Sequence, residues 1–234
     1  MKILRILIFA GLTAAVIAGA VLWYHGVSNE LTDSDKEYIP KFTDGIAPAS
    51  FDSSYEDQIA FIKDVQNAVM NIAPVNKGLP YGQEREPRNL YDAKLGLCFD
   101  RSRVIEKILR HHGFRTRHIF LYSVKDSNTI SAFATPGVPS HAITEVLTER
   151  GWLVVDSNDR WVSMDAANNP RGMDDLRNAA QDEAAVNWLE PPPPIYRDIA
   201  PAAYVYGLYS RHGEFYPPYN AIPDVNYSEL FENF

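Results

Sequence analysis

The stretch that decides the fold is GLCFDRS, residues 96–102, which holds the only cysteine of the 234-residue chain. Apolar residues share one face from here to about His112, at Val104, Ile105, Ile108 and Leu109, and Gly113 follows as a stop signal. This spacing predicts a helix over about 98–112. Cys98 then lies in the first helical turn, where unpaired backbone N–H groups and the helix dipole favour an anion. Cys98 is therefore either a buried apolar side chain or a thiolate nucleophile, and its own N–H is placed to serve as an oxyanion donor.

Two further stretches supply partners for such a thiol, namely SHAITEV, residues 140–146, and GWLVVD, residues 151–156. Their pattern predicts two strands joined by a tight turn. If that turn has two or four residues, Leu147 pairs with Trp152, and His141 and Asp156 become diagonal neighbours on one face. A three-residue turn would send them to opposite faces. The first register predicts a triad in which Cys98 attacks, His141 acts as base and Asp156 orients the imidazole.

The remaining patterns describe an α+β domain. An amphipathic helix is expected over 55–72 and a loop over 74–94, and strands are expected over 114–122, 140–147 and 152–156, with a long polar loop over 123–139. Helices that precede consecutive antiparallel strands are typical of this fold class.

At these motifs the chain resembles the transglutaminase-like superfamily of papain-type folds. The matching residues, in order, are Cys98, Asp100, Ser102, Gly113, His141, Ala142, Glu145, Val146, Gly151, Trp152 and Asp156. The resemblance covers roughly residues 55–165 and implies a nucleophile at a helix N-terminus packed on an antiparallel sheet. It implies the same triad of Cys98, His141 and Asp156. The sequence departs from the family in Ser157, where Pro is frequent, and in having no upstream Gln, Trp or Tyr that matches a second oxyanion donor.

Three other residues are candidates for supporting the site. Asp100 is either a first-turn carboxylate favoured by the helix dipole or a residue that holds a loop near the site. Glu145 lies on the His141 face of its strand and either supports His141 or forms an ion pair with Arg115 or Arg117. Trp152 is expected to pack in the core.

The amino terminus predicts a membrane segment. Lys2 and Arg5 precede an uncharged stretch over residues 6–24, which is about long enough to cross the hydrocarbon core, and acidic residues follow it. The positive-inside rule then places the rest of the chain outside the cytoplasm. We expect a single-pass protein of a bacterial inner membrane with its domain in the periplasm. The alternatives are a signal peptide cleaved near Ala18-Gly19-Ala20 and an ordinary buried helix.

These patterns divide the chain into four parts. We expect a membrane anchor over 1–27, a polar tether over 28–54, a transglutaminase-like domain over 55–190 and a Pro/Tyr-rich extension over 191–234. The extension holds seven of the thirteen tyrosines, which either pack over the domain or stack on sugars or peptides.

Composition excludes several classes of protein. A net charge of −8 argues against nucleic-acid binding, and one cysteine permits neither an internal disulfide nor a thiolate zinc site. The six histidines lack metal-ligand spacing, so neither a metal nor a cofactor is expected. We expect an exported thiol enzyme, a peptidase, amidase or transglutaminase-type acyltransferase, that acts on amide bonds of an envelope protein or peptide through a Cys98 thioester. The alternative is a catalytically silent binding or assembly module of the cell envelope.

Overall fold

The computed structural model describes residues 2–80, 82–180, 182–210 and 224–234, without the side chains of residues 2–8, 10 and 183. Its first half is helical, with α1 (Lys2–Tyr24), α2 (Asp33–Phe42), α3 (Tyr55–Ile72), α4 (Pro87–Ala93) and α5 (Cys98–His111). Then follow β1 (Thr116–Ser123), α6 (Thr129–Phe133), β2 (Ser140–Thr148), β3 (Gly151–Val155), α7 (Met173–Ala179) and a 3-10 turn, Glu183–Ala185. The chain ends with α8 (Pro194–Ile199), β4 (Ala202–Tyr206), β5 (Leu208–Tyr209), β6 (Asp224–Val225), α9 (Tyr227–Leu230) and a 3-10 turn, Phe231–Asn233.

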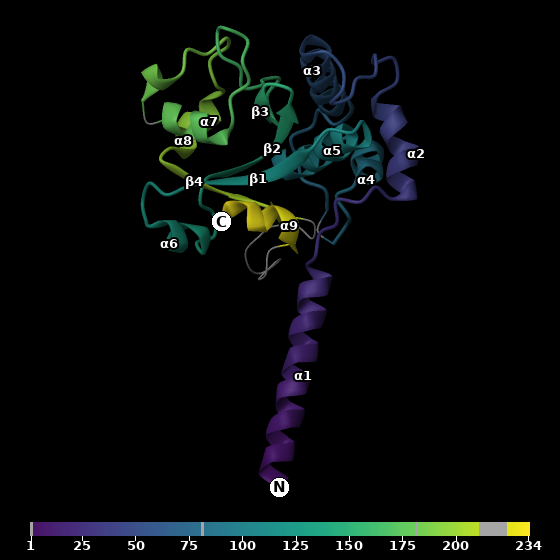
Figure 1. Cartoon of the computed structure of the whole chain (residues 1–234), viewed down its shortest axis with the longest axis vertical. Helices are drawn as coiled ribbons and strands as arrows, with labels where there is room; N and C mark the ends of the chain where they lie inside the picture. The colour runs from purple at the N-terminus through teal and green to yellow at the C-terminus, as the bar shows by residue number, and fades with distance from the viewer. Residues whose placement is uncertain (1, 81, 181, 211–223) are drawn as a thin grey trace.

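A four-stranded antiparallel sheet forms the centre of the domain, in the order β3-β2-β1-β4. Helices α3 and α5 cover one face and bury Val146, Leu153 and Val155. Helices α7 and α8 cover the other face, over Ile119 and Ile143 among others. Figure 1 shows α2 to α5 gathered on one side of the domain and α7 and α8 on the other. The predicted α+β class with an antiparallel sheet is confirmed.

The expected tether over 28–54 is instead part of the folded domain. Thr32 and Asp35 form a capping box that begins α2, and Ile39 and Phe42 of that helix are buried in the core with α3 and α5. The carboxylate of Asp35 also forms a buried ion pair with Lys107 of α5. The predicted loops over 74–94 and 123–139 likewise contain short helices, α4 and α6. Pro87 stands in the first turn of α4, where its missing N–H costs no hydrogen bond.

The Pro/Tyr-rich segment is not a separate extension, because it completes the sheet and the core. Strand β4 pairs with β1 along the edge of the sheet. Tyr196, Tyr206 and Tyr209 are buried, so the packing of tyrosines over the domain is confirmed for these three. Tyr216 and Tyr219 lie outside the described residues.

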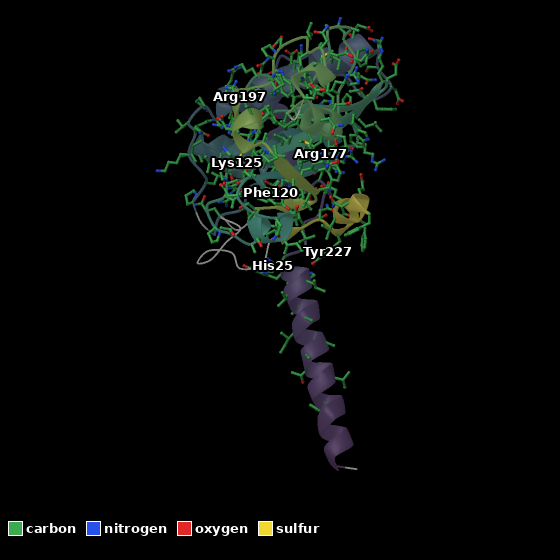
Figure 2. The ribbon with its side chains drawn as sticks, turned by 90° about the vertical axis from the view of Figure 1, so that its left-hand side faces the viewer. His25, Phe120, Lys125, Arg177, Arg197 and Tyr227 are labelled. Carbon is green, nitrogen blue, oxygen red and sulfur yellow. The ribbon has the colours of Figure 1, made fainter. Side chains whose placement is uncertain are left out.

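Helix α1 leaves the domain beside α9 (Figure 1). Most of its described apolar side chains are exposed, Trp23 to 83% and Phe9 to 76%. Among the residues whose side chains are described, no helix is long and apolar enough to cross a membrane. Figure 2 shows His25 and Tyr227 at the junction with the domain. There His25 pairs with Asp224 at 3.1 Å, and the Tyr227 hydroxyl donates to the Leu22 carbonyl at 3.0 Å.

Candidate active site

Cys98 is the first residue of α5, as predicted, and its side chain is partly buried. In that position its N–H has no partner within the helix. The chain approaches through Gly96, where an added Cβ would lie 2.7 Å from the Leu90 Cδ1 atom. The glycine is therefore required by close packing against α4. This packing fixes the direction in which the chain enters the helix.

The hairpin of β2 and β3 brings His141 and Asp156 together. Leu147 pairs with Trp152 across a two-residue turn, which is one of the two registers that the sequence allowed. The Nε2 atom of His141 lies 3.0 Å from the Oδ2 atom of Asp156, and the two residues are only 1% and 0% exposed. The predicted juxtaposition of these two side chains is therefore present in the structure.

The charge of Asp156 determines whether the His141 imidazole is protonated. Burial by itself lowers the pKa of His141, but the charge and hydrogen bond of Asp156, assisted by Cys98, raise that pKa to about 10. Burial likewise opposes ionisation of Asp156, yet His141 and the hydrogen bonds to the carboxylate bring the pKa of Asp156 below its ordinary value. At neutral pH the pair is an imidazolium and a carboxylate. The Nδ1 atom of His141 is buried and meets no oxygen or nitrogen partner among the described residues. Cys98 is the other group close enough to help raise the pKa of the ring.

Several groups hold Asp156 in place. Its Oδ1 atom accepts the backbone N–H groups of Asn158 and Asp159 at 2.7 and 2.8 Å. Its Oδ2 atom accepts the hydroxyl of Tyr196 in addition to His141. From α3, the amide nitrogen of Gln66 donates to the carbonyls of Asp156, Asp159 and Trp161 at 2.7–3.0 Å.

A second cation stands at the site. The guanidinium of Arg101, on the first turns of α5, donates to the Asn158 side chain at 2.8 Å and to the Ala73 carbonyl at 3.0 Å. Burial lowers the pKa of Arg101, while its electrostatic interactions with Cys98, Asp100 and Asp156 act against that shift. Arg101 therefore adds positive charge near the thiol and links α5 to the loop that follows Asp156.

Asp100 holds a loop, one of the two roles that the sequence left open. Its Oδ2 atom accepts the backbone N–H groups of Leu97 at 2.9 Å and Leu79 at 3.2 Å. Its Oδ1 atom pairs with the Arg85 guanidinium at 3.0 Å. The carboxylate thus ties the segment upstream of Cys98 to α5.

Glu145 and Trp152 do not contact the Cys98–His141 pair. Glu145 forms an ion pair with Arg117 at 2.7 Å and accepts the backbone N–H of Met173, so its ion-pair alternative holds. Trp152 is only partly buried, and the guanidinium of Arg117 lies over its ring at 3.9 Å. The expected core position of Trp152 is wrong, because its strand is at the edge of the sheet and arginines cover the ring instead of apolar side chains.

Sequence reasoning missed Gln66, Arg101 and Tyr196. Gln66 did leave a signal, since it is a polar residue on the apolar face of a predicted helix, and buried polar groups are hydrogen-bonded. Arg101 lies within the quoted motif, but its contacts come from loops distant in sequence. Tyr196 follows four prolines and has no local pattern that points to Asp156.

Comparison with known protein families identifies the domain. The model of the transglutaminase-like superfamily matches residues 48–166, about half of the chain, and this range includes Cys98, His141 and Asp156. No curated protein and no solved structure gave a significant match.

Proposed function

Because the chain belongs to the transglutaminase-like superfamily, we propose that it is a thiol enzyme that acts on amide or peptide bonds through an acyl-enzyme on Cys98. The observation that carries this proposal is the buried His141–Asp156 pair, which leaves the second imidazole nitrogen without another partner. The single cysteine, at a helix N-terminus, is close enough to help raise the pKa of His141. A charged imidazole, a helix terminus and Arg101 together place positive charge near the Cys98 sulfur.

The chemistry follows from these positions. The Cys98 sulfur attacks the carbonyl carbon, and the carbonyl oxygen takes the electron pair of the broken π bond near the Cys98 N–H. Collapse of this intermediate expels the amine, which takes its proton from the His141 imidazolium. Neutral His141 then removes a proton from water, the resulting hydroxide attacks the thioester, and the acid and the thiolate–imidazolium pair are released. If a second amine replaces water, the product is a new amide.

We favour hydrolysis over transfer, because nothing in the sequence marks a site that excludes water and accepts a second amine. The proposed substrate is a protein or peptide of the cell envelope. The proposed location is a bacterial inner membrane, with residues 6–24 as the anchor and the domain in the periplasm. The exposed apolar side chains of α1 and the basic residues before them support this placement.

An activated acyl donor tests the proposal without knowledge of the natural substrate. The full-length chain in detergent is mixed with p-nitrophenyl acetate, and the intact mass is followed together with p-nitrophenol release. We expect an acetyl adduct on Cys98, a large loss of its formation rate in His141→Ala, and no adduct at that residue in Cys98→Ala. Equal rates in the wild type and His141→Ala would show an unactivated thiol and would leave the silent binding module as the better interpretation. Incorporation of a labelled primary amine into an acceptor protein would show transfer instead of hydrolysis.

A further inference from the structure

Tyr196 brings a second hydrogen-bond donor to the carboxylate oxygen that faces His141. Its hydroxyl lies 2.5 Å from the Oδ2 atom of Asp156, the same atom that lies 3.0 Å from His141 Nε2. Its ring also meets the His141 ring edge-on, at 5.9 Å between centroids and 74° between planes. Tyr196 is 4% exposed and comes from α8, outside the residues that the family model matches.

The carboxylate does not need Tyr196 to stay in place. Its other oxygen is held by two backbone N–H groups, at 2.7 and 2.8 Å, and Gln66 holds the carbonyl of the same residue. These two backbone donors and Gln66 act on Asp156 independently of the Tyr196 hydroxyl. The contribution of the Tyr196 hydroxyl is therefore to the charge of Asp156 more than to its position.

Two donors on one oxygen share its negative charge. A hydrogen bond from Tyr196 stabilises the carboxylate, and a carboxylate stabilised in this way attracts the imidazolium less strongly. We propose that Tyr196 acts on the thiol reaction through Asp156: its hydroxyl draws charge from the carboxylate and thereby eases release of the His141 proton to the leaving amine. This inference rests on the proposed function of Cys98.

The hydroxyl is suited to remain a donor throughout. Burial raises the pKa of Tyr196 well above its ordinary value, and the neighbouring Asp156 carboxylate adds to that rise. The phenol therefore keeps its proton at every pH at which the pair with His141 exists. A group that stays protonated can redistribute charge without taking part in proton transfer itself.

The first measurement needs no enzymatic activity. His141 is titrated by NMR of ¹⁵N-histidine-labelled full-length chain in a Cys98→Ala background, which removes the influence of the thiol on His141. Tyr196→Phe is expected to raise the pKa of His141 by about half a unit to one unit, the size of one hydrogen bond to a charged group. The Nε2–H proton should also move downfield as the bond to Asp156 strengthens. An unchanged or lowered pKa in a folded variant would overturn the inference.

A matched control and a kinetic measurement complete the test. Tyr204→Phe removes a hydroxyl that donates to the exposed Asp174 at 2.8 Å and should leave the His141 titration unchanged.

With Cys98 present, Tyr196→Phe is expected to lower kcat for an amide substrate roughly 3- to 10-fold at pH 7 with little change in KM. If Cys98 of the wild type is not acylated, the proposed function fails, but the NMR comparison still decides whether Tyr196 lowers the pKa of His141.

Discussion

At the scale of single residues, Asp156 is the group that keeps His141 charged. Asp156→Asn removes the largest attraction and leaves burial, which lowers the pKa of the imidazole and is opposed only by the smaller effect of Cys98. We therefore expect the pKa of His141 to fall from about 10 to below its ordinary value of about 6.5. The amide N–H₂ would also face Nε2, so the neutral ring must carry its proton on Nδ1, toward the thiol. Titration of His141 by NMR measures both changes.

The neighbouring acid offers a matched control for this substitution. Asp159 lies near the pair, but its side chain does not bond His141, and its backbone N–H donates to Asp156 whichever side chain it carries. Asp159→Asn should leave His141 charged at pH 7 and the iodoacetamide reactivity of Cys98 close to that of the wild type. Asp156→Asn should slow the same alkylation at pH 7 by tenfold or more. Equal alkylation rates in the two variants would contradict this role of Asp156.

The positions of Cys98, His141 and Asp156 in the fold could be predicted because each residue is marked by its own element. Cys98 is marked by the start of a helix, and His141 and Asp156 by a hairpin whose turn leaves few registers. The partners of these residues depend on tertiary contacts. Arg101 reaches loops 25 to 57 residues away, and Tyr196 reaches back 40 residues to Asp156. No local periodicity encodes such distances.

At the scale of elements, α3 supports the site through Gln66. Its amide nitrogen shares its two hydrogens among three carbonyls of the loop after β3, at 2.7–3.0 Å, and Gln66 is 1% exposed. Gln66→Leu fills a similar volume but leaves those carbonyls without this donor in the interior. We expect a loss of about 1–3 kcal/mol in the free energy of unfolding, the usual cost of stranding buried polar groups. Urea unfolding of the full-length chain measures it.

The next residue along α3 provides the comparison. The Asn67 side chain accepts from Arg160 at the surface, so Asn67→Ala should cost less than about 0.5 kcal/mol. The Gln66 variant should also slow acylation of Cys98, because the loop that carries Asp156 loses an attachment. A Gln66→Leu protein as stable as Asn67→Ala would show that the three hydrogen bonds contribute little.

The elements that escaped prediction are short and depend on their neighbours. Helix α2 has ten residues, includes Pro40 and offers the core mainly Ile39 and Phe42. Isolated helices of that length are marginal, so α2 forms because α3, α4 and α5 cover its apolar face. The capping box of Thr32 and Asp35 was a readable signal. Strand β4 was hidden because its partner β1 precedes it by about 80 residues.

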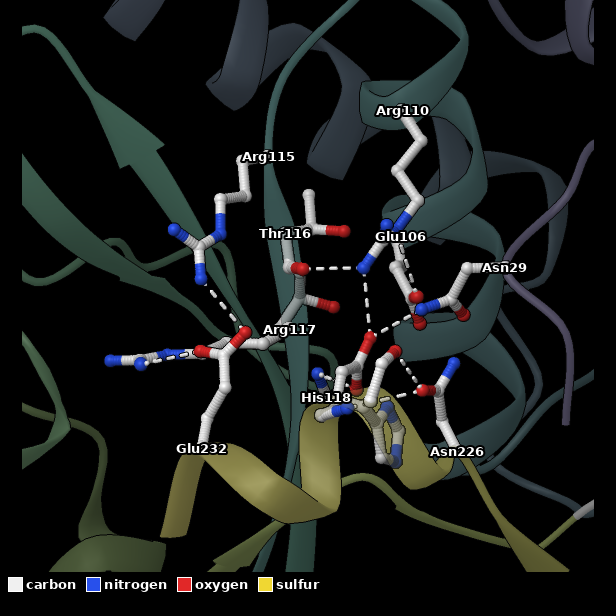
Figure 3. Close-up of polar contacts among 12 residues, drawn as sticks. Asn29, Glu106, Arg110, Arg115, Thr116, Arg117, His118, Asn226 and Glu232 are labelled. Carbon is white, nitrogen blue, oxygen red and sulfur yellow. Dashed lines mark hydrogen bonds and ion pairs between the residues drawn. The ribbon is translucent and has the colours of Figure 1, made fainter. Parts of the chain in front are cut away.

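At the scale of the whole molecule, the last residues of the chain join α1 and α5 to the sheet. The peptide groups of His25 and Val27 exchange hydrogen bonds with Val225, and the Asn29 side chain donates to Glu229 at 2.6 Å. Figure 3 shows α9 below Arg110, His118 and Asn29, with Glu232 beside Arg115 and Arg117. These contacts join the end of α1 to the domain.

Glu229 makes this junction sensitive to pH. Its carboxylate pairs with Arg110 at 2.8 Å. It also accepts from the Tyr209 hydroxyl and from the backbone N–H of His118, both at 3.0 Å. Burial, followed by repulsion from Glu106, nevertheless raises the pKa of Glu229 to about 7. Between its unfolded value near 4.5 and 7, the folded chain therefore holds a proton that the unfolded chain has released. Stability from this group is complete below pH 4.5 and is lost as the pH rises through 7.

Glu229→Gln should remove this pH dependence. The wild type is expected to lose stability relative to the variant as the pH rises from about 4.5 to 7, by at most roughly 1.4 kcal/mol per pH unit for one proton. Glu232→Gln serves as control, because the pKa of Glu232 is lowered by Arg115 and Arg117 against the effect of burial. Its contribution is present above its unfolded pKa and is lost only at lower pH, so this variant should follow the wild type in parallel between pH 4.5 and 7. The measurement is the free energy of unfolding of the three full-length proteins between pH 4.5 and 7. If the curves of Glu229→Gln and the wild type are parallel, Glu229 is ionised in the folded protein over this whole range and the prediction is wrong.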